Sequence, residues 1–93
     1  MTDALVRQTI LFRGEVQGVG FRYTALQVSA GFLVAGFVRN LPNGQVEMVV
    51  EGKRESVDAF VNALAFRMRT HIHETTIESA APTGEFDAFN IRR

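Results

Sequence analysis

A glycine-rich stretch at residues 14–22, GEVQGVGFR, constrains the fold more than any other part of the chain. Before it, apolar and polar residues alternate as in a half-buried strand. After it, Phe21, Ala25 and Val28 recur at the spacing of an amphipathic helix. Glycines allow positive φ angles, and the first turn of a helix offers free N–H groups and partial positive charge. A strand, a glycine loop and a helix with Arg22 in its first turn therefore predict an anion site, with phosphate as the natural ligand.

The length and composition of the chain predict one domain. Its 93 residues suffice for a single hydrophobic core, and 46% of them are hydrophobic, so we expect residues 1–93 to fold together. Cysteine is absent, which excludes disulfides, thiolate metal sites and thiol catalysis and suits a reducing cytoplasm. Ten basic and ten acidic residues balance. No overall charge therefore attracts the chain to nucleic acid or to an anionic membrane.

The sequence also argues against export and against a membrane span. The N-terminal segment MTDALVRQTILFRGE places charged residues among its apolar ones, unlike the apolar core of a signal peptide. The longest apolar stretch, residues 32–38, is far below the ~20 residues of a membrane-spanning helix. We therefore expect a soluble cytoplasmic protein. As a small neutral domain with a short final strand, it is also expected to be a monomer.

The first half of the chain predicts a strand, a helix and a hairpin. Residues 8–16 alternate as a half-buried strand, and the helix after the glycines should end near Gly31. Residues 33–40 are rich in strand-forming types, the turn at 41–44 contains an Asn-Gly pair, and residues 45–51 alternate until Gly52. These two runs predict a hairpin that ends at Gly52.

The second half predicts one more helix and two strands. Apolar residues at helical spacing mark about four turns of helix: Val57, Phe60, Val61, Leu64 and Met68. Residues 72–79 then indicate a strand, 82–84 a loop and 86–91 a short final strand. The order βαββαβ with a fifth short strand is that of the α+β ferredoxin-like, split βαβ fold. In this fold two helices cover one face of an antiparallel sheet.

Two separated segments resemble the paired signature of the acylphosphatase family. The first is the stretch at 14–22, and the second is GFVRNLPNGQVE at residues 36–47. Their order and the helix between them also match, so the resemblance extends over nearly the whole chain. It includes the Phe-x-Ile ending that is frequent in the family, present at residues 89–91. One departure is MRTHIHETTIES at residues 68–79, where many members carry a Gly-Pro segment.

The resemblance implies a hydrolase that cleaves carboxyl-phosphate anhydrides into a carboxylate and inorganic phosphate. Arg22 would bind the phosphate of an acyl phosphate, and Asn40 would orient the attacking water. No metal and no organic cofactor are expected, and the partners would be the acyl phosphate and the phosphate product. The resemblance also implies that the following backbone N–H groups surround the phosphate: Gln17, Gly18, Val19, Gly20 and Phe21.

The residue types in the two segments suit that chemistry. Phosphoryl transfer spreads charge over equatorial oxygens, so positioning and electrostatic stabilisation supply most of the catalysis. A guanidinium and oriented amides match that charge distribution. A carboxylate leaving group, with a pKa of about 4, needs no general acid. We hypothesise that a substrate oxygen accepts the proton of the water, because Asn40 is neutral.

Two other functions use the same topology. An anion-binding domain with little catalysis would share the fold, as in the acylphosphatase-like domains of larger carbamoyl-transfer proteins. RNA binding of the RRM type requires aromatic residues on central strands, which residues 45–51 lack. His71 and His73 have a spacing that some metal sites use, but without a third convincing ligand we expect exposed polar residues there.

Overall fold

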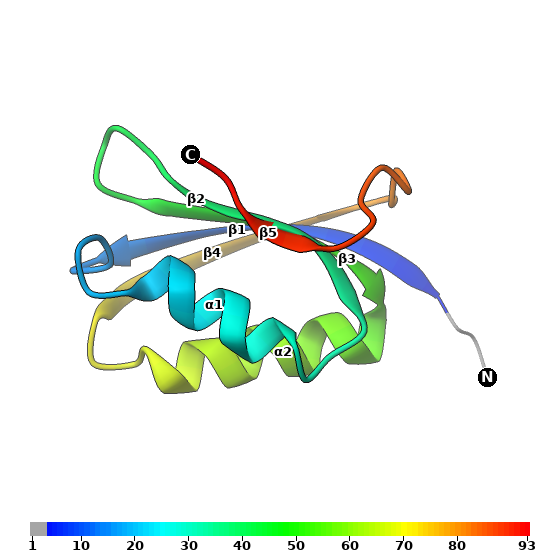
Figure 1. Cartoon of the computed structure of the whole chain (residues 1–93), viewed down its shortest axis with the longest axis horizontal. Coiled ribbons are helices and arrows are strands. Elements are labelled where there is room, and N and C mark those ends of the chain that lie inside the picture. The colour runs from blue at the N-terminus through cyan, green and yellow to red at the C-terminus, as the bar shows by residue number, and fades with distance from the viewer. Residues whose placement is uncertain (1–3) are drawn as a thin grey trace.

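The computed structural model describes residues 4–93 as a sheet with two helices on one of its faces (Figure 1). The sheet has the strand order β4-β1-β3-β2-β5. The elements follow one another as β1 (Leu5–Gly14), α1 (Phe21–Ser29), β2 (Val34–Asn40), β3 (Val46–Lys53), α2 (Arg54–Arg67), β4 (Ile72–Ala80) and β5 (Phe89–Ile91). The predicted split βαβ order is thereby confirmed. Between residues 4 and 93, every helix is too short and too polar to cross a membrane.

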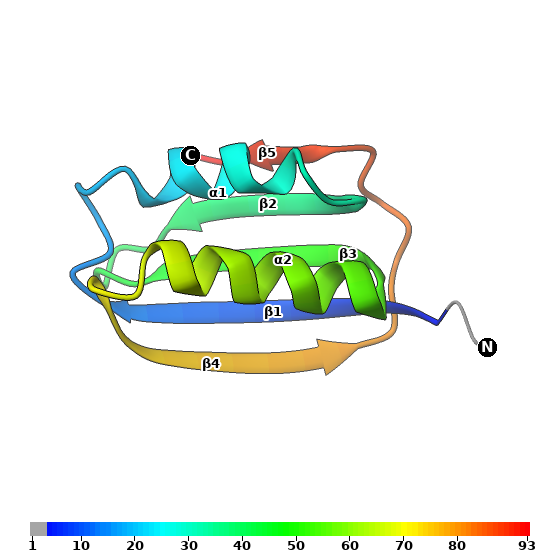
Figure 2. The same ribbon diagram turned by 90° about the horizontal axis from the view of Figure 1, so that it is seen from below.

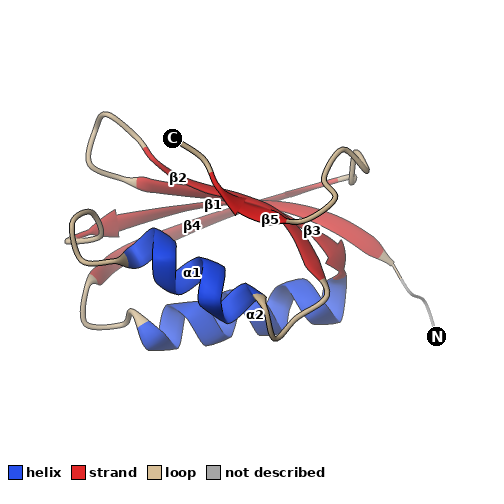
Figure 3. Ribbon diagram, viewed as in Figure 1, coloured by secondary structure: helices blue, strands red, loops and turns tan. Residues whose placement is uncertain are grey.

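The core lies between the sheet and the helices, as Figure 3 shows in its two layers. Strand alternation supplies one side of it, because Val46, Met48 and Val50 of β3 all point to the helices and are fully buried. The apolar stripes of α1 and α2 supply the other side, with Phe21 and Phe60 among their buried members. Phe12 at the end of β1 packs on Phe21 at 4.8 Å between ring centroids, which fixes the start of α1 over the sheet. 

The sheet is mixed, whereas the sequence predicted an antiparallel one. Strands β4, β1, β3 and β2 pair antiparallel, but β5 runs parallel to β2, with Val38 opposite Ile91. The chain leaves β4 at one edge and crosses the end of the sheet to the other edge, where it returns in the direction of β2 (Figure 2). This crossover produces the parallel pair.

The ends of three strands differ from those predicted from the sequence. Strand β3 continues through Gly52 to Lys53, since Gly52 pairs with Val6 of β1 and with Val34 of β2. A Cβ at position 52 would lie 2.8 Å from the Leu33 carbonyl oxygen. Glycine is therefore required there by a close backbone approach inside the strand, and it does not end the strand. Strand β1 ends at Gly14, and Val16 is buried in the connection that follows. The last strand covers three residues only, Phe89–Ile91.

The face of the sheet away from the helices, the open face, is partly covered by the segment between β4 and β5. Glu51 of β3 is buried there and accepts hydrogen bonds from the backbone N–H groups of Thr83 at 2.9 Å and Gly84 at 3.0 Å. It also pairs with Arg7 of β1 at 2.8 Å. These four residues are called the Glu51 network below. They fix the crossover at the end of the sheet where β3 ends.

Candidate active site

The glycine loop, residues 15–20, connects β1 to α1 at the other end of the sheet (Figure 2). Gly18 and Gly20 have φ angles of 78° and 77°, and a Cβ at either position would meet nothing within 4 Å. The left-handed backbone, and not lack of space, therefore selects glycine here. Gly20 precedes α1 without a side-chain cap, and its carbonyl accepts the Thr24 N–H at 2.9 Å.

The backbone amides of the loop are available to a ligand. Within residues 4–93, the N–H groups of residues 17–21 donate no hydrogen bond to backbone or side-chain acceptors. The last of them, that of Phe21, opens α1, where intrahelical acceptors do not exist. A row of oriented donors at a helix start, next to left-handed glycines, forms a concave site of the kind that binds anions.

A cavity of about 200 Å³ lies beside the loop and contains the two residues to which the family resemblance assigns catalysis. Arg22 reaches it from the first turn of α1, and Asn40 from the end of β2. The two meet because α1 packs over β2 and β5. The cavity is lined by Val16, Gly18, Gly20, Phe21, Arg22, Tyr23, Asn40, Ile91 and Arg93.

Three of the predicted phosphate-binding residues use their side chains elsewhere. Gln17 turns its side chain to the β2–β3 hairpin, where its Nε2 donates to the carbonyl oxygens of Leu41 and Gln45. The Phe21 ring is buried in the core, and the Val19 side chain is 38% exposed at the tip of the loop. Only the backbone N–H groups of these three residues are left to contact a phosphate, which is the contact that the resemblance implies.

Arg22 carries a positive charge that the described protein does not neutralise. Its guanidinium is half-buried and has no hydrogen bond or ion pair within residues 4–93. Arg13 and Arg39, in contrast, pair with Glu74 and Glu47 at 2.6 Å each. A cation in the first turn of a helix opposes the helix dipole. Since no lining residue of the cavity is acidic, an anion there would relieve this opposition.

Sequence reasoning missed the contribution of the C-terminal segment. Ile91 lines the cavity because β5 pairs with β2, and the Arg92 N–H donates to the Val38 carbonyl at 2.9 Å. The guanidinium carbon of Arg92 lies 3.7 Å from the centre of the Phe37 ring, and the next residue, Arg93, lines the cavity instead. The Phe-x-Ile segment at residues 89–91 was the sequence signal for this contribution. Its place beside Asn40 depends on the parallel pairing of β5 with β2, which the sequence did not predict.

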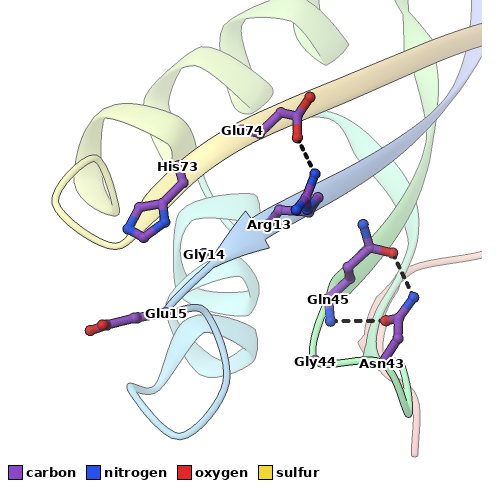
Figure 4. A pocket seen from close by; sticks show the side chains of 8 residues that line it. All are labelled: Arg13, Gly14, Glu15, Asn43, Gly44, Gln45, His73 and Glu74. Carbon is purple, nitrogen blue, oxygen red and sulfur yellow. Dashed lines mark hydrogen bonds and ion pairs between the residues drawn. The ribbon is translucent and has the colours of Figure 1, made fainter.

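A larger, open hollow of about 700 Å³ lies on the other side of the hairpin (Figure 4). Its polar groups mostly pair with one another. Arg13 pairs with Glu74 at 2.6 Å, and Asn43 donates to Gln45 Oε1 at 2.9 Å. His73 lines this hollow, and across residues 4–93 no three His, Cys, Asp or Glu residues are grouped to hold a metal ion. Arg22 and Asn40 do not line it, so the smaller cavity is the candidate active site.

Known proteins similar to this chain agree with the resemblance. The sequence profile of the acylphosphatase family matches residues 8–91. An acylphosphatase of Paenarthrobacter aurescens (strain TC1) is 40% identical over 92 residues, which cover 98% of each chain. The crystal structure of acylphosphatase from Bacillus subtilis aligns with a TM-score of 0.84 at 26% identity, covering 95% of this chain and 99% of that one. The crystal structure of T. kodakarensis HypF aligns with a TM-score of 0.79 at 28% identity, covering 92% of this chain and 12% of that one.

Proposed function

We propose a mechanism for the hydrolysis of acyl phosphates by this chain, which belongs to the acylphosphatase family. The glycine loop and Arg22 hold the phosphate, and Asn40 orients the attacking water. One observation carries the proposal: Arg22 and Asn40 line a single cavity beside backbone amides that have no partner within residues 4–93.

The phosphate end of the substrate is bound by groups that are already oriented. The N–H groups of residues 17–21 donate to its oxygens, and Gly18, Gly20 and Phe21 among these residues line the cavity. The Arg22 guanidinium, which also lines it, adds a charge-assisted contact. In the transition state, charge spreads over the equatorial oxygens, and fixed donors stabilise it without having to reorganise. The loop therefore contributes both to binding and to rate.

Asn40 supplies the position of the nucleophile. Its side chain reaches the cavity from β2, opposite the loop, so a water held there would approach the phosphorus from a defined side. The amide is neutral and takes no proton from the water. In the proposed step, the water oxygen bonds to phosphorus while the bond from phosphorus to the carboxyl oxygen breaks. The proton passes to a phosphate oxygen of the substrate.

The residues around the cavity suit a good leaving group. No Asp, Glu, His or Lys side chain lines it, so the lining supplies no carboxyl, imidazolium or ammonium group to protonate a poor leaving group such as an alkoxide. The carboxylate released from an acyl phosphate, whose acid has a pKa of about 4, leaves without protonation. The products are the carboxylate and inorganic phosphate. We further propose that the protein works as a monomer in the cytoplasm, a reducing compartment that suits a chain without cysteine.

Hydrolysis of benzoyl phosphate, measured with EDTA present, tests the proposal. Arg22→Ala should lower kcat/KM by about 100-fold or more and raise the inhibition constant of phosphate, because it removes a charged contact. Asn40→Ala should lower kcat by a similar factor and leave that constant within about twofold, because it acts on the water. Arg13→Ala, which removes an arginine outside the cavity, is the matched control and should change neither value by more than about twofold.

Two results would contradict the proposal. If either cavity variant keeps the kcat/KM of the wild type, the role given to that residue is wrong. A folded wild type that binds phosphate without turnover would favour an anion-binding domain with little catalysis.

A further inference from the structure

The Gln17 side chain joins the glycine loop to the β2–β3 hairpin. Its Nε2 donates to the carbonyl oxygen of Leu41 at 2.8 Å and to that of Gln45 at 2.9 Å. Both amide protons are used, since one N–H points to each acceptor. The side chain is half-buried, which shields these bonds from competing water. The two segments that resemble the family signature are thus connected by one side chain.

The acceptors of these bonds lie where the hairpin closes, directly after Asn40. The Leu41 N–H donates to the Gln45 carbonyl at 2.9 Å, so that oxygen accepts from both Leu41 and Gln17. Asn40 is paired with Val46 at the end of β2, and Leu41 follows it. A shift of the Leu41 carbonyl would therefore move the backbone that carries the Asn40 side chain.

The loop itself has little else to fix it against the hairpin. Val16 is buried in the core next to Gln17, but Gly18, Val19 and Gly20 are exposed. Their amides have no partner within residues 4–93. The two ends of the loop are held by backbone bonds, from the Glu15 N–H to the His71 carbonyl and from the Thr24 N–H to the Gly20 carbonyl, both at 2.9 Å. Between these ends, the buried Val16 side chain and the Gln17 amide hold the loop, and the Gln17 amide bonds it to the hairpin that carries Asn40.

We propose that Gln17 is a positioning residue that sets the place of Asn40 relative to the bound phosphate. The inference rests on the proposed function, because it assumes that Asn40 orients the water. Gln17 acts through the hairpin and not on the substrate, since its side-chain nitrogen is already committed to two carbonyl oxygens. In-line attack tolerates small errors poorly, and a misplacement of 1 Å costs up to about 100-fold in rate.

Gln17→Met tests the proposal, because methionine has a similar size and no N–H group. We expect kcat for benzoyl phosphate to fall about tenfold, with the inhibition constant of phosphate within about twofold of the wild type. Gln17→Ala should repeat the result and shows that it does not depend on methionine. Gln27→Met is the matched control, since it makes the same substitution at an exposed position of α1 outside the cavity and should leave kcat within about twofold.

A double-mutant cycle separates positioning from general loosening. If Gln17 acts through Asn40, then Gln17→Met should change kcat less than about twofold in the Asn40→Ala background. An unchanged tenfold loss in that background would overturn the proposal. So would a rise in the phosphate inhibition constant without a change in kcat, or a folded Gln17→Met variant with wild-type kcat.

The cycle also distinguishes this inference from the proposed function. Asn40→Ala alone tests whether Asn40 takes part in turnover, and wild-type kcat in that variant would overturn the mechanism before Gln17 is considered. If Asn40→Ala is impaired and Gln17→Met is not, the mechanism stands and the positioning role of Gln17 fails. The thermal unfolding midpoint of each variant, measured in the assay buffer, establishes that the protein compared is folded.

Discussion

The two ends of the sheet use backbone amides in opposite ways. At one end, the Glu51 carboxylate accepts the N–H groups of Thr83 and Gly84 and the Arg7 guanidinium. The negative charge belongs to the protein, and every bond is made in the folded state. At the other end, the amides of residues 17–21 have no partner within the described chain, nor has the Arg22 guanidinium.

The difference shows how a small fold separates stability from function. A carboxylate supplied by the chain stabilises the folded state and closes the crossover between β4 and β5. An anion site without such a carboxylate leaves its exposed N–H donors to solvent and its cation without an anionic partner in the described chain, so both are available to a ligand. The following predictions test this contrast between an internally filled anion site and an open one.

Acid should selectively weaken the end that contains Glu51. Burial by itself would raise the pKa of Glu51, but the bonds from Thr83, Arg7 and Gly84 outweigh it and lower the pKa from 4.5 to about 2. The lowered pKa means that the contribution of Glu51 to stability is complete above pH 4.5 and is lost as the pH falls towards 2. The shift corresponds to about 3 kcal/mol.

Urea unfolding of the wild type and Glu51→Gln measures this contribution. The variant should be less stable by about 3 kcal/mol at pH 7, and most of the difference should be lost by pH 2, where the pH reaches the pKa of Glu51 in the folded wild type. Other carboxylates titrate in both proteins and cancel. A difference that does not change with pH would show that the charge of Glu51 is not what stabilises this end.

Phosphate should stabilise the protein through the open end. At a free phosphate concentration ten times the dissociation constant, the wild type should gain about 1.4 kcal/mol. Glu51→Gln should gain the same amount, because its site is intact, whereas Arg22→Ala should gain almost nothing at that concentration. Equal stabilisation of wild type and Arg22→Ala by phosphate would mean that the anion binds elsewhere, for example at Arg13.

Two glycines offer a matched comparison of the two ends. Gly20 and Gly84 have φ angles of 77° and 73°, and a Cβ at either would meet nothing within 4 Å. Alanine should therefore cost about 1 to 2 kcal/mol of folding stability at each, from the left-handed backbone. Only Gly20→Ala should also raise the phosphate inhibition constant, by about tenfold. Equal effects of both on inhibition would remove the functional distinction between the two loops.

Much of the fold could be predicted because its signals are local. The alternation through Val46, Met48 and Val50 and the Asn43-Gly44 turn define the hairpin, and the helical stripes define α1 and α2. The direction of β5 could not be predicted, because a three-residue strand carries no signal of which neighbour it joins. The same holds for Glu51. Alternation placed it on the polar face of β3, and its burial depends on a segment more than thirty residues later.

The residues of the candidate site likewise include some that the sequence predicts and some that it does not. Arg22 and Asn40 stood out because they belong to two segments that can be read in the sequence. The places of Ile91 and Arg93 at the cavity depend on the β2–β5 pairing, which local patterns do not encode. Gln17 was expected to contribute its backbone N–H, and its side-chain contact with the hairpin appears only once both segments are placed in space.

Amide NMR during a titration with inorganic phosphate tests the central claim most directly. If the glycine loop is the open anion site, the resonances of residues 17–22 should shift and saturate together, while those of Thr83 and Gly84, already bonded to Glu51, should stay unchanged. Arg22→Ala should abolish the shifts at the same concentrations. Saturable shifts centred on the larger hollow, at Arg13 and Gln45, with none at residues 17–22, would contradict the claim.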